Sequence, residues 1–309
     1  MSDPRELRIG IIGCDTSHAI EFTARLNDGG HPGHVAGARV VVAHPTVSQD
    51  MPWSQTRAAG FVEELQFRHG VEMVASSDAL LERCDAVLLC SLDGRAHPEQ
   101  VAPVLRAGLP VFLDKPVAGS LKEAERIYEL AAETGTPLFS SSALRWYPGI
   151  KSLVEADAGV VRGAVSYGPA PIEPTHPDLF FYGIHPTEAL FTVLGTGCQS
   201  VQRTTTAHLS VVTGLWTEEK VGTLHALHRW PAEYKVIKFG DAAVVEQQDA
   251  GDYTPLLRQI IAFFGSGVAP VSPAETLEIY AFMEAADESK RRGGVKVGLN
   301  EVRGERWRT

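Results

Sequence analysis

The sequence predicts an α/β protein with an N-terminal doubly wound parallel sheet and a C-terminal α/β domain built on a mixed, largely antiparallel sheet. In the first half, short runs rich in β-branched residues alternate with helical patterns, which is typical of parallel strands joined by crossover helices. This alternation stops near residues 143–148. Beyond that point several strand patterns follow one another directly, as they do in antiparallel or mixed sheets.

The expected elements can be placed along the chain. Strands of the parallel sheet are expected at residues 7–12, 39–43, 71–75, 85–90, 109–113 and 137–140. A helix over 120–133 would have Ser120 at its N-cap and Glu123 three residues on, the spacing of a capping box. The second half is expected to hold a helix at 150–156, a helix after Pro186, strands at 163–167, 199–206, 209–216, 222–230 and 234–239, and closing helices at 254–264 and 273–291. The sequence thus predicts one domain over residues 1–145 and a second over 146–309.

Composition limits the classes of function. The chain has 309 residues, of which 44% are hydrophobic and 21% charged, as in a globular protein with a sizeable core. Its formal charge of -10 and pI near 5.6 argue against nucleic-acid and anionic-membrane partners, because such partners need clustered Lys and Arg. The four cysteines show no C-x-x-C spacing, and we see no signal peptide or long apolar run. We expect an enzyme of the reducing cytoplasm.

The first strand leads into residues 10–18, GIIGCDTSH, where a dinucleotide-binding (Rossmann) turn carries G-x-G-x-x-G. Gly13 matches the first glycine, whereas Asp15 replaces the second, which normally lets the backbone approach a pyrophosphate. Thr16 and Ser17 offer hydroxyl and backbone N–H groups at a helix start, and these can bind phosphate if Asp15 turns away. The alternative is an ordinary strand-to-helix turn in which one of these three residues is the N-cap.

The end of the second predicted strand reads VAHPT, so His44 stands where an NAD enzyme usually presents Asp or Glu to the adenosine ribose. Neither an acid nor an arginine occupies this position. A small polar patch of His44, Thr46 and Ser48 is compatible with the 2′-phosphate of NADP. The choice between NAD and NADP therefore stays open.

Two short segments carry candidate catalytic side chains. Lys115, within FLDKP (residues 112–116), follows an apolar strand at the carboxyl end, where open parallel sheets bind ligands. His185, within GIHPTE (residues 183–188), lies about 70 residues further along. A lysine and a histidine can share a proton relay, as the oxidation of a sugar hydroxyl requires. The alternatives are a structural lysine beside a helix end and a core or capping histidine.

Together these segments resemble the glucose-fructose oxidoreductase and inositol dehydrogenase family (Gfo/Idh/MocA) over almost the whole chain. DKP at 114–116 is similar to the E-K-P motif of that family, and GIH at 183–185 with LG at 194–195 resembles the helix that bears its histidine. The other segments that carry the resemblance are RIGIIGC at 8–14, AHP at 96–98, AGLPV at 107–111, and ETLE at 275–278 with the helix that follows it.

The resemblance implies a Rossmann domain that binds NAD or NADP and a second domain whose sheet builds homodimers or homotetramers. It also implies hydride transfer to or from a secondary alcohol carbon of a sugar, polyol or related carbohydrate. His185 would take the hydroxyl proton while Lys115 stabilises the developing alkoxide, and Arg145 and Tyr182 would contact the substrate. The cofactor contacts expected are Gly13, Asp15, Thr16, Ser17, His18, His44, Ser91, His97, Asp114 and Lys115.

The chain departs from the family at a position beside its histidine. Many members carry an aspartate four residues before that histidine, where this chain has Phe181. Glu188, three residues after His185 on the same helical face, is a candidate to orient the imidazole and contact the substrate, and Asp178 is an alternative. The aromatic run 180–182 suggests a more apolar pocket wall. We infer divergence in the substrate or in the reaction.

Other functions remain open at this stage. We predict no metal site, although His176, Asp178, His185 and Glu188 could cluster as the metal site of a sugar isomerase or lyase if the cofactor has been lost. A redox-neutral or non-redox sugar-modifying enzyme, such as an isomerase, lyase or glycosidase, is therefore one alternative to the oxidoreductase. A non-catalytic protein that binds a ligand on the same scaffold is another.

Overall fold

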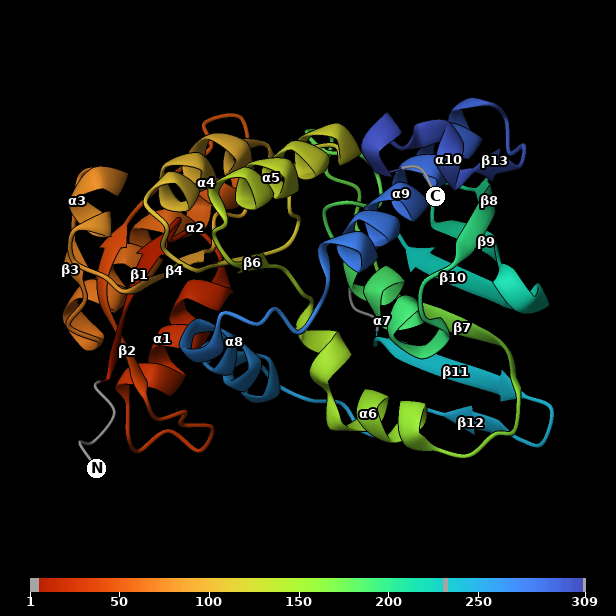
Figure 1. Cartoon of the computed structure of the whole chain (residues 1–309), viewed down its shortest axis with the longest axis horizontal. Helices are drawn as coiled ribbons and strands as arrows, with labels where there is room; N and C mark the ends of the chain where they lie inside the picture. The colour runs from red at the N-terminus through yellow and green to blue at the C-terminus, as the bar shows by residue number, and fades with distance from the viewer. Residues whose placement is uncertain (1–5, 230–232, 308–309) are drawn as a thin grey trace. The chain divides into compact units, whose positions relative to one another are not determined.

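The computed structural model describes residues 6–229 and 233–307, and its packing divides the chain into two compact units, which we describe separately (Figure 1). Unit 1 runs to Gly119 and also contains Arg126–Ser140 and Tyr253–Ser272. Unit 2 contains Ser120–Glu125, Ser141–Asp252 and the chain from Pro273 onward. Neither unit is one continuous stretch of sequence. The domain division at residue 145 stays a prediction.

Unit 1 is built on a six-stranded sheet in the order β3-β2-β1-β4-β5-β6, with every described pair parallel. This confirms the predicted doubly wound parallel sheet. Strand β4, along its whole length, and strand β1, from Ile9 onward, are apolar and buried, as expected of strands covered on both faces. The strands are β1 (Leu7–Ile12), β2 (Ala38–His44), β3 (Glu72–Met73), β4 (Ala86–Leu89), β5 (Val111–Leu113) and β6 (Leu138–Phe139).

Helices connect these strands, and one helix reaches unit 1 from far along the sequence. The ring of Phe263 in α8 lies 4.8 Å from that of Phe139, and Arg25 in α1 donates a hydrogen bond to Thr254. Sequence patterns predicted α8 but did not indicate what it packs against. The helices are α1 (Ser17–Asn27), α2 (Pro52–Glu63), α3 (Ser77–Leu81), α4 (His97–Arg106), α5 (Leu121–Thr134), which spans the division between the units, and α8 (Thr254–Ser266).

Unit 2 is built on a seven-stranded sheet in the order β12-β11-β7-β10-β9-β8-β13. Strands β7 and β10 pair in parallel and the other described neighbours are antiparallel, which confirms the predicted mixed sheet. The strands are β7 (Val161–Pro169), β8 (Cys198–Thr205), β9 (Leu209–Trp216), β10 (Val221–Leu227), β11 (Lys235–Gly240), β12 (Val244–Glu246) and β13 (Val297–Gly298).

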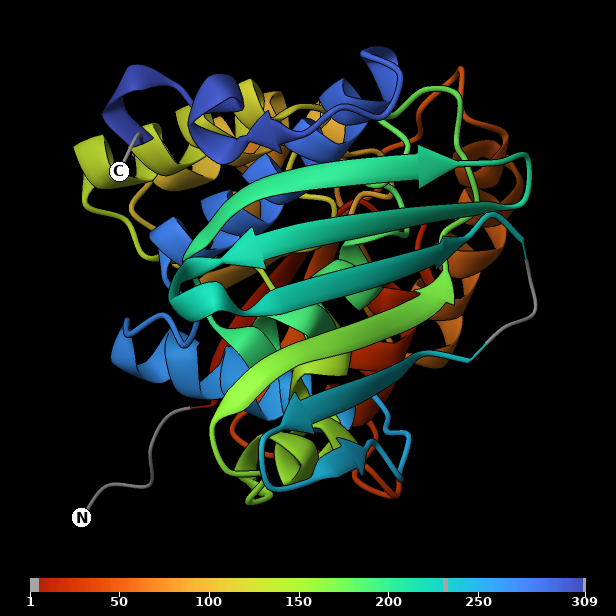
Figure 2. The ribbon, with the colours of Figure 1, turned by 90° about the vertical axis from the view of Figure 1, so that its right-hand side faces the viewer.

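Helices α7 (Ile184–Leu194) and α9 (Pro273–Arg291) pack on one face of this sheet. The rings of Trp216 in β9, Phe191 in α7 and Phe282 in α9 pack against one another in tilted and edge-on arrangements. Their centroids lie 5.2–5.9 Å apart, and they form the core between the sheet and the helices. Figure 2 shows the other face, over which no helix of the described chain lies. Helices α6 (Pro148–Glu155) and α10 (Leu299–Val302) complete unit 2.

The predicted boundaries differ from the observed ones in a few places. The strand predicted over 222–230 ends at Leu227, and residue 230 lies outside the described residues. Helix α7 begins two residues before Pro186, because proline is tolerated in a first helical turn. Half of the predicted capping box of α5 is confirmed, since Ser120 Oγ accepts from the Glu123 amide; the Glu123 carboxylate accepts from the Ser120 hydroxyl. Strands β12 and β13 and helix α10 were not predicted. None of the helices in the described ranges is long and apolar enough to cross a membrane.

Candidate functional site

In unit 1 the carboxyl ends of four parallel strands meet at one edge of the sheet. Ile12 of β1 lies opposite His44 of β2 on one side and Leu89 of β4 on the other, and Leu89 lies opposite Leu113 of β5. After β1 the chain continues to β2, toward one edge of the sheet, and after β4 it continues to β5, toward the other edge. Such a reversal of strand order marks the crevice where open α/β sheets bind ligands.

The turn from β1 into α1 passes so close to the loop after β4 that it requires glycine. Gly13 has φ +83°, and a Cβ there would lie 2.2–2.5 Å from atoms of Ser91. Thr16 is the N-cap of α1 but makes no side-chain cap, and its hydroxyl donates to the carbonyl of Cys90. Ser17 is exposed. The first backbone N–H groups of α1 therefore lack a side-chain acceptor from Thr16, an arrangement that suits a phosphate.

Asp15, which replaces the second glycine of the motif, is engaged with the protein. Its side chain is buried, with Oδ1 accepting from the Leu92 amide at 2.9 Å and Oδ2 from Ser54 Oγ at 2.6 Å. Burial raises the pKa of Asp15 against the opposing effect of these two hydrogen bonds. Because both oxygens have partners in the protein, the residues at the start of α1 fit a dinucleotide pyrophosphate despite the aspartate.

The loops that follow β2 and β4 bond to each other. Thr46 Oγ1 lies 3.0 Å from Ser91 Oγ, which also donates to Gln100. Arg95 pairs with Asp50 of the first loop and with Asp93 of the second. His44 lies at the end of β2, and its Nδ1 is 3.1 Å from the carbonyl of Val74. Polar groups are thus present where the adenosine part of the cofactor is predicted to bind. These groups also hold the two loops together.

The turn after β5 holds a buried contact between a histidine and an aspartate beside Lys115. Asp114 Oδ2 lies 2.6 Å from His18 Nδ1, and Asp114 Oδ1 accepts from the Lys115 amide. Burial alone would raise the pKa of Asp114, but the charge and hydrogen bond of His18, helped by Lys115, outweigh it and lower the pKa to about 2. Lys115 is itself only 4% exposed. The structure thus brings His18, Asp114 and Lys115 together at the carboxyl end of β5.

His97, at the first position of α4, is buried in the same region. Its Nε2 lies 2.9 Å from the carbonyl of Ser91 and its Nδ1 3.2 Å from that of Val117. Burial lowers the pKa of His97, which favours the neutral imidazole. Both ring nitrogens contact backbone, so His97 braces the loops after β4 and β5. Its predicted contact with a cofactor stays a prediction.

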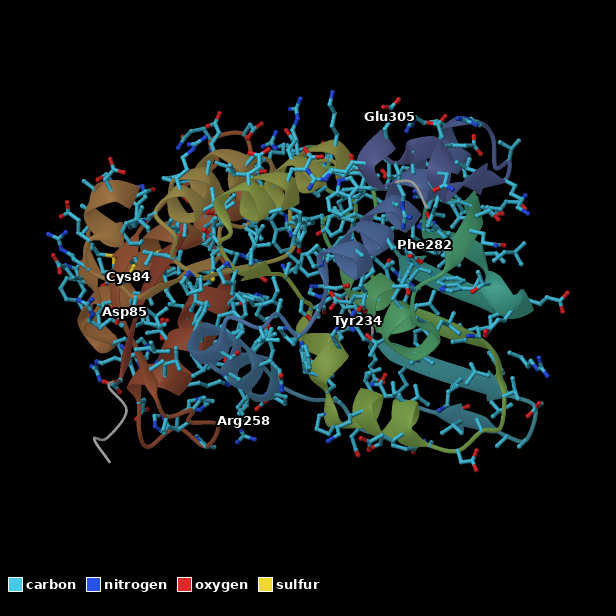
Figure 3. The ribbon with its side chains drawn as sticks, viewed as in Figure 1. Cys84, Asp85, Tyr234, Arg258, Phe282 and Glu305 are labelled. Carbon is cyan, nitrogen blue, oxygen red and sulfur yellow. The ribbon has the colours of Figure 1, made fainter. Side chains whose placement is uncertain are left out.

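In unit 2 the histidine of α7 is bonded to a serine. His185 Nδ1 lies 2.7 Å from Ser142 Oγ, and Ser142 is fully buried just before the short 3₁₀ helix Ala143–Trp146. The rings of Tyr182 and Tyr234 lie 5.6 Å and 5.7 Å from the imidazole, and Figure 3 labels Tyr234. Contacts on these sides restrict the orientation of the His185 ring.

Glu188 lies one helical turn beyond His185, and its carboxylate bonds to the segment that carries Ser142. It accepts from Ser141 Oγ, the Ser142 amide and Arg145 Nε, each at 2.7 Å. Arg145 also pairs with Glu275 of α9 at 2.6 Å. Burial alone would lower the pKa of the Arg145 guanidinium, but the two glutamates raise it. Glu188 and Arg145 therefore form a buried ion pair that fixes the position of Ser142.

The structure gives the other predicted partners of His185 different roles. Asp178 pairs with Arg203 and Lys290, so this carboxylate balances a buried guanidinium. Phe181 is 1% exposed, and its ring packs against those of His176 and Tyr182. The metal cluster considered from the sequence is wrong, because Asp178 and Glu188 are bound to different cationic side chains and no metal-binding group of His, Cys, Asp or Glu is present in the described ranges.

Sequence reasoning missed several residues of these two clusters. Ser141 and Ser142 were not singled out, although they follow β6 at a strand end, and neither was Ser54, the partner of Asp15. The rule that ligand-contacting groups follow strand ends would have drawn attention to the two serines. Nothing in the local pattern around Ser54 points to Asp15, which lies 39 residues away in the chain.

The N-terminal part of the chain is similar to a known family. Residues 7–141 match the model of an oxidoreductase family described by its NAD-binding Rossmann fold. An inositol 2-dehydrogenase from Cereibacter sphaeroides is 33% identical over 144 residues, which cover 46% of this chain and 37% of that protein. The chain therefore matches well under half of the length of this curated relative.

Solved structures resemble the fold along nearly the whole chain. An oxidoreductase from Agrobacterium radiobacter, solved with NAD+, L-tartaric acid and magnesium, superposes with a TM-score of 0.77 at 15% identity and covers 97% of this chain and 100% of its own. The apo scyllo-inositol dehydrogenase from Lactobacillus casei has a TM-score of 0.78 at 13% identity, with coverage of 96% and 99%. Residues 7–141, which carry the motifs at Gly13 and Lys115, thus match the Gfo/Idh/MocA family of oxidoreductases, and the chain beyond them is similar to these solved structures in fold.

Proposed function

We propose that this protein is an NAD(P)-dependent oxidoreductase that transfers a hydride to or from a secondary alcohol carbon of a sugar, polyol or related carbohydrate. The observation that carries the proposal is Lys115, a buried lysine at the carboxyl end of β5, beside the His18–Asp114 pair in a family member with an NAD-binding Rossmann fold. An ammonium group held in such a crevice is suited to stabilise an alkoxide that develops on the substrate.

The cofactor would be held by groups of unit 1. Gly13 and the backbone N–H groups at Thr16 and Ser17 would hold the pyrophosphate, and Asp114 would reach the nicotinamide ribose. When bound, the nicotinamide supplies or accepts the hydride. We expect NAD, in keeping with the description of the family, and the polar residues His44, Thr46 and Ser91 at the adenosine end are also compatible with NADP.

The remaining groups would act on the substrate. Lys115 and His185 would contact the reacting oxygen, and the proton that accompanies hydride transfer would pass through one of them. Tyr182 would provide a ring face for the carbohydrate. Arg145 and Glu188 bond to each other and to their surroundings, so we assign them the positioning of the segment that carries Ser142 in place of the direct substrate contact expected from the sequence.

The test is calorimetric binding of NAD+, NADH, NADP+ and NADPH, followed by turnover of a panel of polyols and sugars with the nucleotide that binds. We expect Lys115→Met to bind nucleotide as the wild type does and to lose at least 100-fold in turnover. Lys122→Met is the control, because Lys122 is exposed on α5 and should leave turnover unchanged. Absence of nucleotide binding would favour the non-redox enzyme or the binding protein. Full turnover by Lys115→Met would contradict the assigned role.

We also propose that the open face of the unit 2 sheet binds a second copy of this chain. Pairing aligns Val211, His225 and Tyr167 in one row across β9, β10 and β7. Leu215 and Val221 pair at the end of this face and are 38% and 40% exposed. A self-complementary apolar face of this kind suits a twofold homodimer or a homotetramer built from such dimers.

Light scattering during gel filtration tests the assembly. We expect a dimer or tetramer for the wild type and a smaller species for the double variant Leu215→Asp, Val221→Asp. Val268→Asp is the control, since Val268 is exposed at 70% but lies in unit 1. A monomeric wild type would contradict the proposal. The cytoplasmic location expected from the composition stays a prediction.

A further inference from the structure

The hydrogen-bond partner of His185 carries a proton, whereas the aspartate expected from the family pattern would carry none at neutral pH. The position four residues before His185 holds Phe181, a buried ring with no hydrogen-bonding group. The imidazole Nδ1 lies instead 2.7 Å from Ser142 Oγ. A carboxylate can only accept from Nδ1, but a hydroxyl can either accept or donate. The direction of this one hydrogen bond decides which ring nitrogen carries the proton of a neutral histidine.

The other contacts of Ser142 determine that direction. A serine hydroxyl has one proton to donate and two lone pairs that accept. The Leu144 amide donates to Ser142 Oγ at 3.2 Å and occupies one lone pair. If His185 Nδ1 also donated, the hydroxyl proton would have no acceptor among the described neighbours of a fully buried residue. A buried O–H group without an acceptor is unfavourable. With Nδ1 as the acceptor, both groups are satisfied.

The backbone that carries Ser142 is held so that the hydroxyl cannot move elsewhere. The Ser142 amide donates to Glu188 Oε2 at 2.7 Å, and Arg145 binds Glu188 Oε1. Glu188 sits on the same helix as His185, so one helix holds both ends of the contact. The carboxylate nearest to Ser142 is therefore occupied by a backbone amide, a hydroxyl and a guanidinium.

We propose that Ser142 is a positioning residue that donates its hydroxyl proton to Nδ1 and holds His185 as the neutral tautomer with the proton on Nε2. A neutral His185 with its proton on Nε2 acts through that nitrogen as a hydrogen-bond donor. This differs from the proton acceptor that the family resemblance implies, and its catalytic meaning rests on the proposed function.

The tautomer can be measured without substrate or nucleotide. We would record long-range ¹H–¹⁵N correlation spectra of the full chain labelled at its histidines, and assign His185 from the signal that is lost in His185→Gln. The expected result for the wild type at neutral pH is an unprotonated Nδ1 and a protonated Nε2. A protonated Nδ1 in the wild type would overturn the proposal, whether or not the protein binds nucleotide.

Two matched substitutions at the serine complete the test. Ser142→Asp retains an acceptor for the Leu144 amide but cannot donate, so we expect the proton of His185 to move to Nδ1. Ser142→Ala removes the donor, and we expect a mixture of the two tautomers. An unchanged tautomer in both variants, with folding confirmed by the other histidine signals, would show that Ser142 does not set the tautomer. If nucleotide binding fails while the tautomer shifts as expected, the proposed function fails and the role of Ser142 stands.

Discussion

Each of the two units buries a histidine against one polar partner, and the partners have opposite character. In unit 1, His18 Nδ1 faces the carboxylate of Asp114, which can only accept and whose pKa is lowered to about 2. In unit 2, His185 Nδ1 faces the hydroxyl of Ser142, which has a proton to donate. The same side chain is therefore expected to donate through Nδ1 in unit 1 and to accept through Nδ1 in unit 2.

This difference shows that the type of a residue does not determine its proton chemistry. His18 contacts Asp114 in the turn before Lys115, and this contact favours the ionised form of Asp114. Nδ1 of His185 faces a hydroxyl, whereas the carboxylate of Glu188 is bonded to Ser141, Ser142 and Arg145. The partner and its own further contacts set the tautomer in each case.

The largest effect is expected from Phe181→Asp, which would offer His185 a carboxylate like the one that His18 has. We expect a loss of about 4 kcal/mol or more in the free energy of unfolding, because a buried ring is removed and a charge is placed in its cavity. Urea unfolding measures this loss, and Phe181→Leu, with an expected loss of about 1 kcal/mol, is the control. Near-native stability of Phe181→Asp would mean that the Phe181 pocket already accommodates a carboxylate.

Removing the cation that neutralises Glu188 should have the next largest effect. Arg145→Ala leaves the buried carboxylate of Glu188 without its ion pair, and we expect a loss of about 3 kcal/mol in stability. The double variant Arg145→Ala, Glu188→Gln should recover part of this loss, since the unpaired charge is then gone. If the double variant is no more stable than Arg145→Ala, the loss comes from packing alone.

The charged pair of unit 1 should give stability a pH dependence. The pKa of Asp114 falls from the ordinary 3.8 to about 2 in the folded protein, so its ionised form favours folding. This contribution, about 2 kcal/mol, is present above pH 4 and is lost as the pH falls from about 4 toward 2. Urea midpoints across this range should converge for the wild type and Asp114→Asn. A constant difference between them down to pH 2 would contradict the shift.

The smallest expected effect compares the two histidine contacts directly. Double-mutant cycles to alanine should give a coupling of about 1.5–3 kcal/mol for His18 with Asp114, and about 0.5–1.5 kcal/mol for His185 with Ser142. The first contact is charge-assisted and the second is between neutral groups. Equal couplings at neutral pH would indicate that His185 is charged, against the neutral tautomer that we infer.

Much of the fold could be predicted from local patterns. The parallel strands β1 and β4 are short, mostly apolar runs bounded by turn signals. The hydrogen bond between the Glu123 amide and the Ser120 hydroxyl marks the start of α5. Short elements were missed where tertiary contacts stabilise them, as for β13, which pairs with β8 over two residues. The packing of α8 on unit 1 was not predicted, because Phe263 and Phe139 are distant in sequence and only their contact reveals it.

The sequence by itself determined the candidate residues and the edge of the sheet at which those of unit 1 collect. Gly13, Ser91 and Asp114 each follow a strand of the parallel sheet and His44 ends one, and parallel strands end at a common edge. Only the tertiary structure decided the hydrogen-bond partners. His18 finds Asp114 across 96 residues and His185 finds Ser142 across 43, while Glu188, three residues from His185, bonds elsewhere. The reason is physical: most buried polar groups need a hydrogen-bond partner, and which partner is within reach depends on all the neighbours that packing brings together.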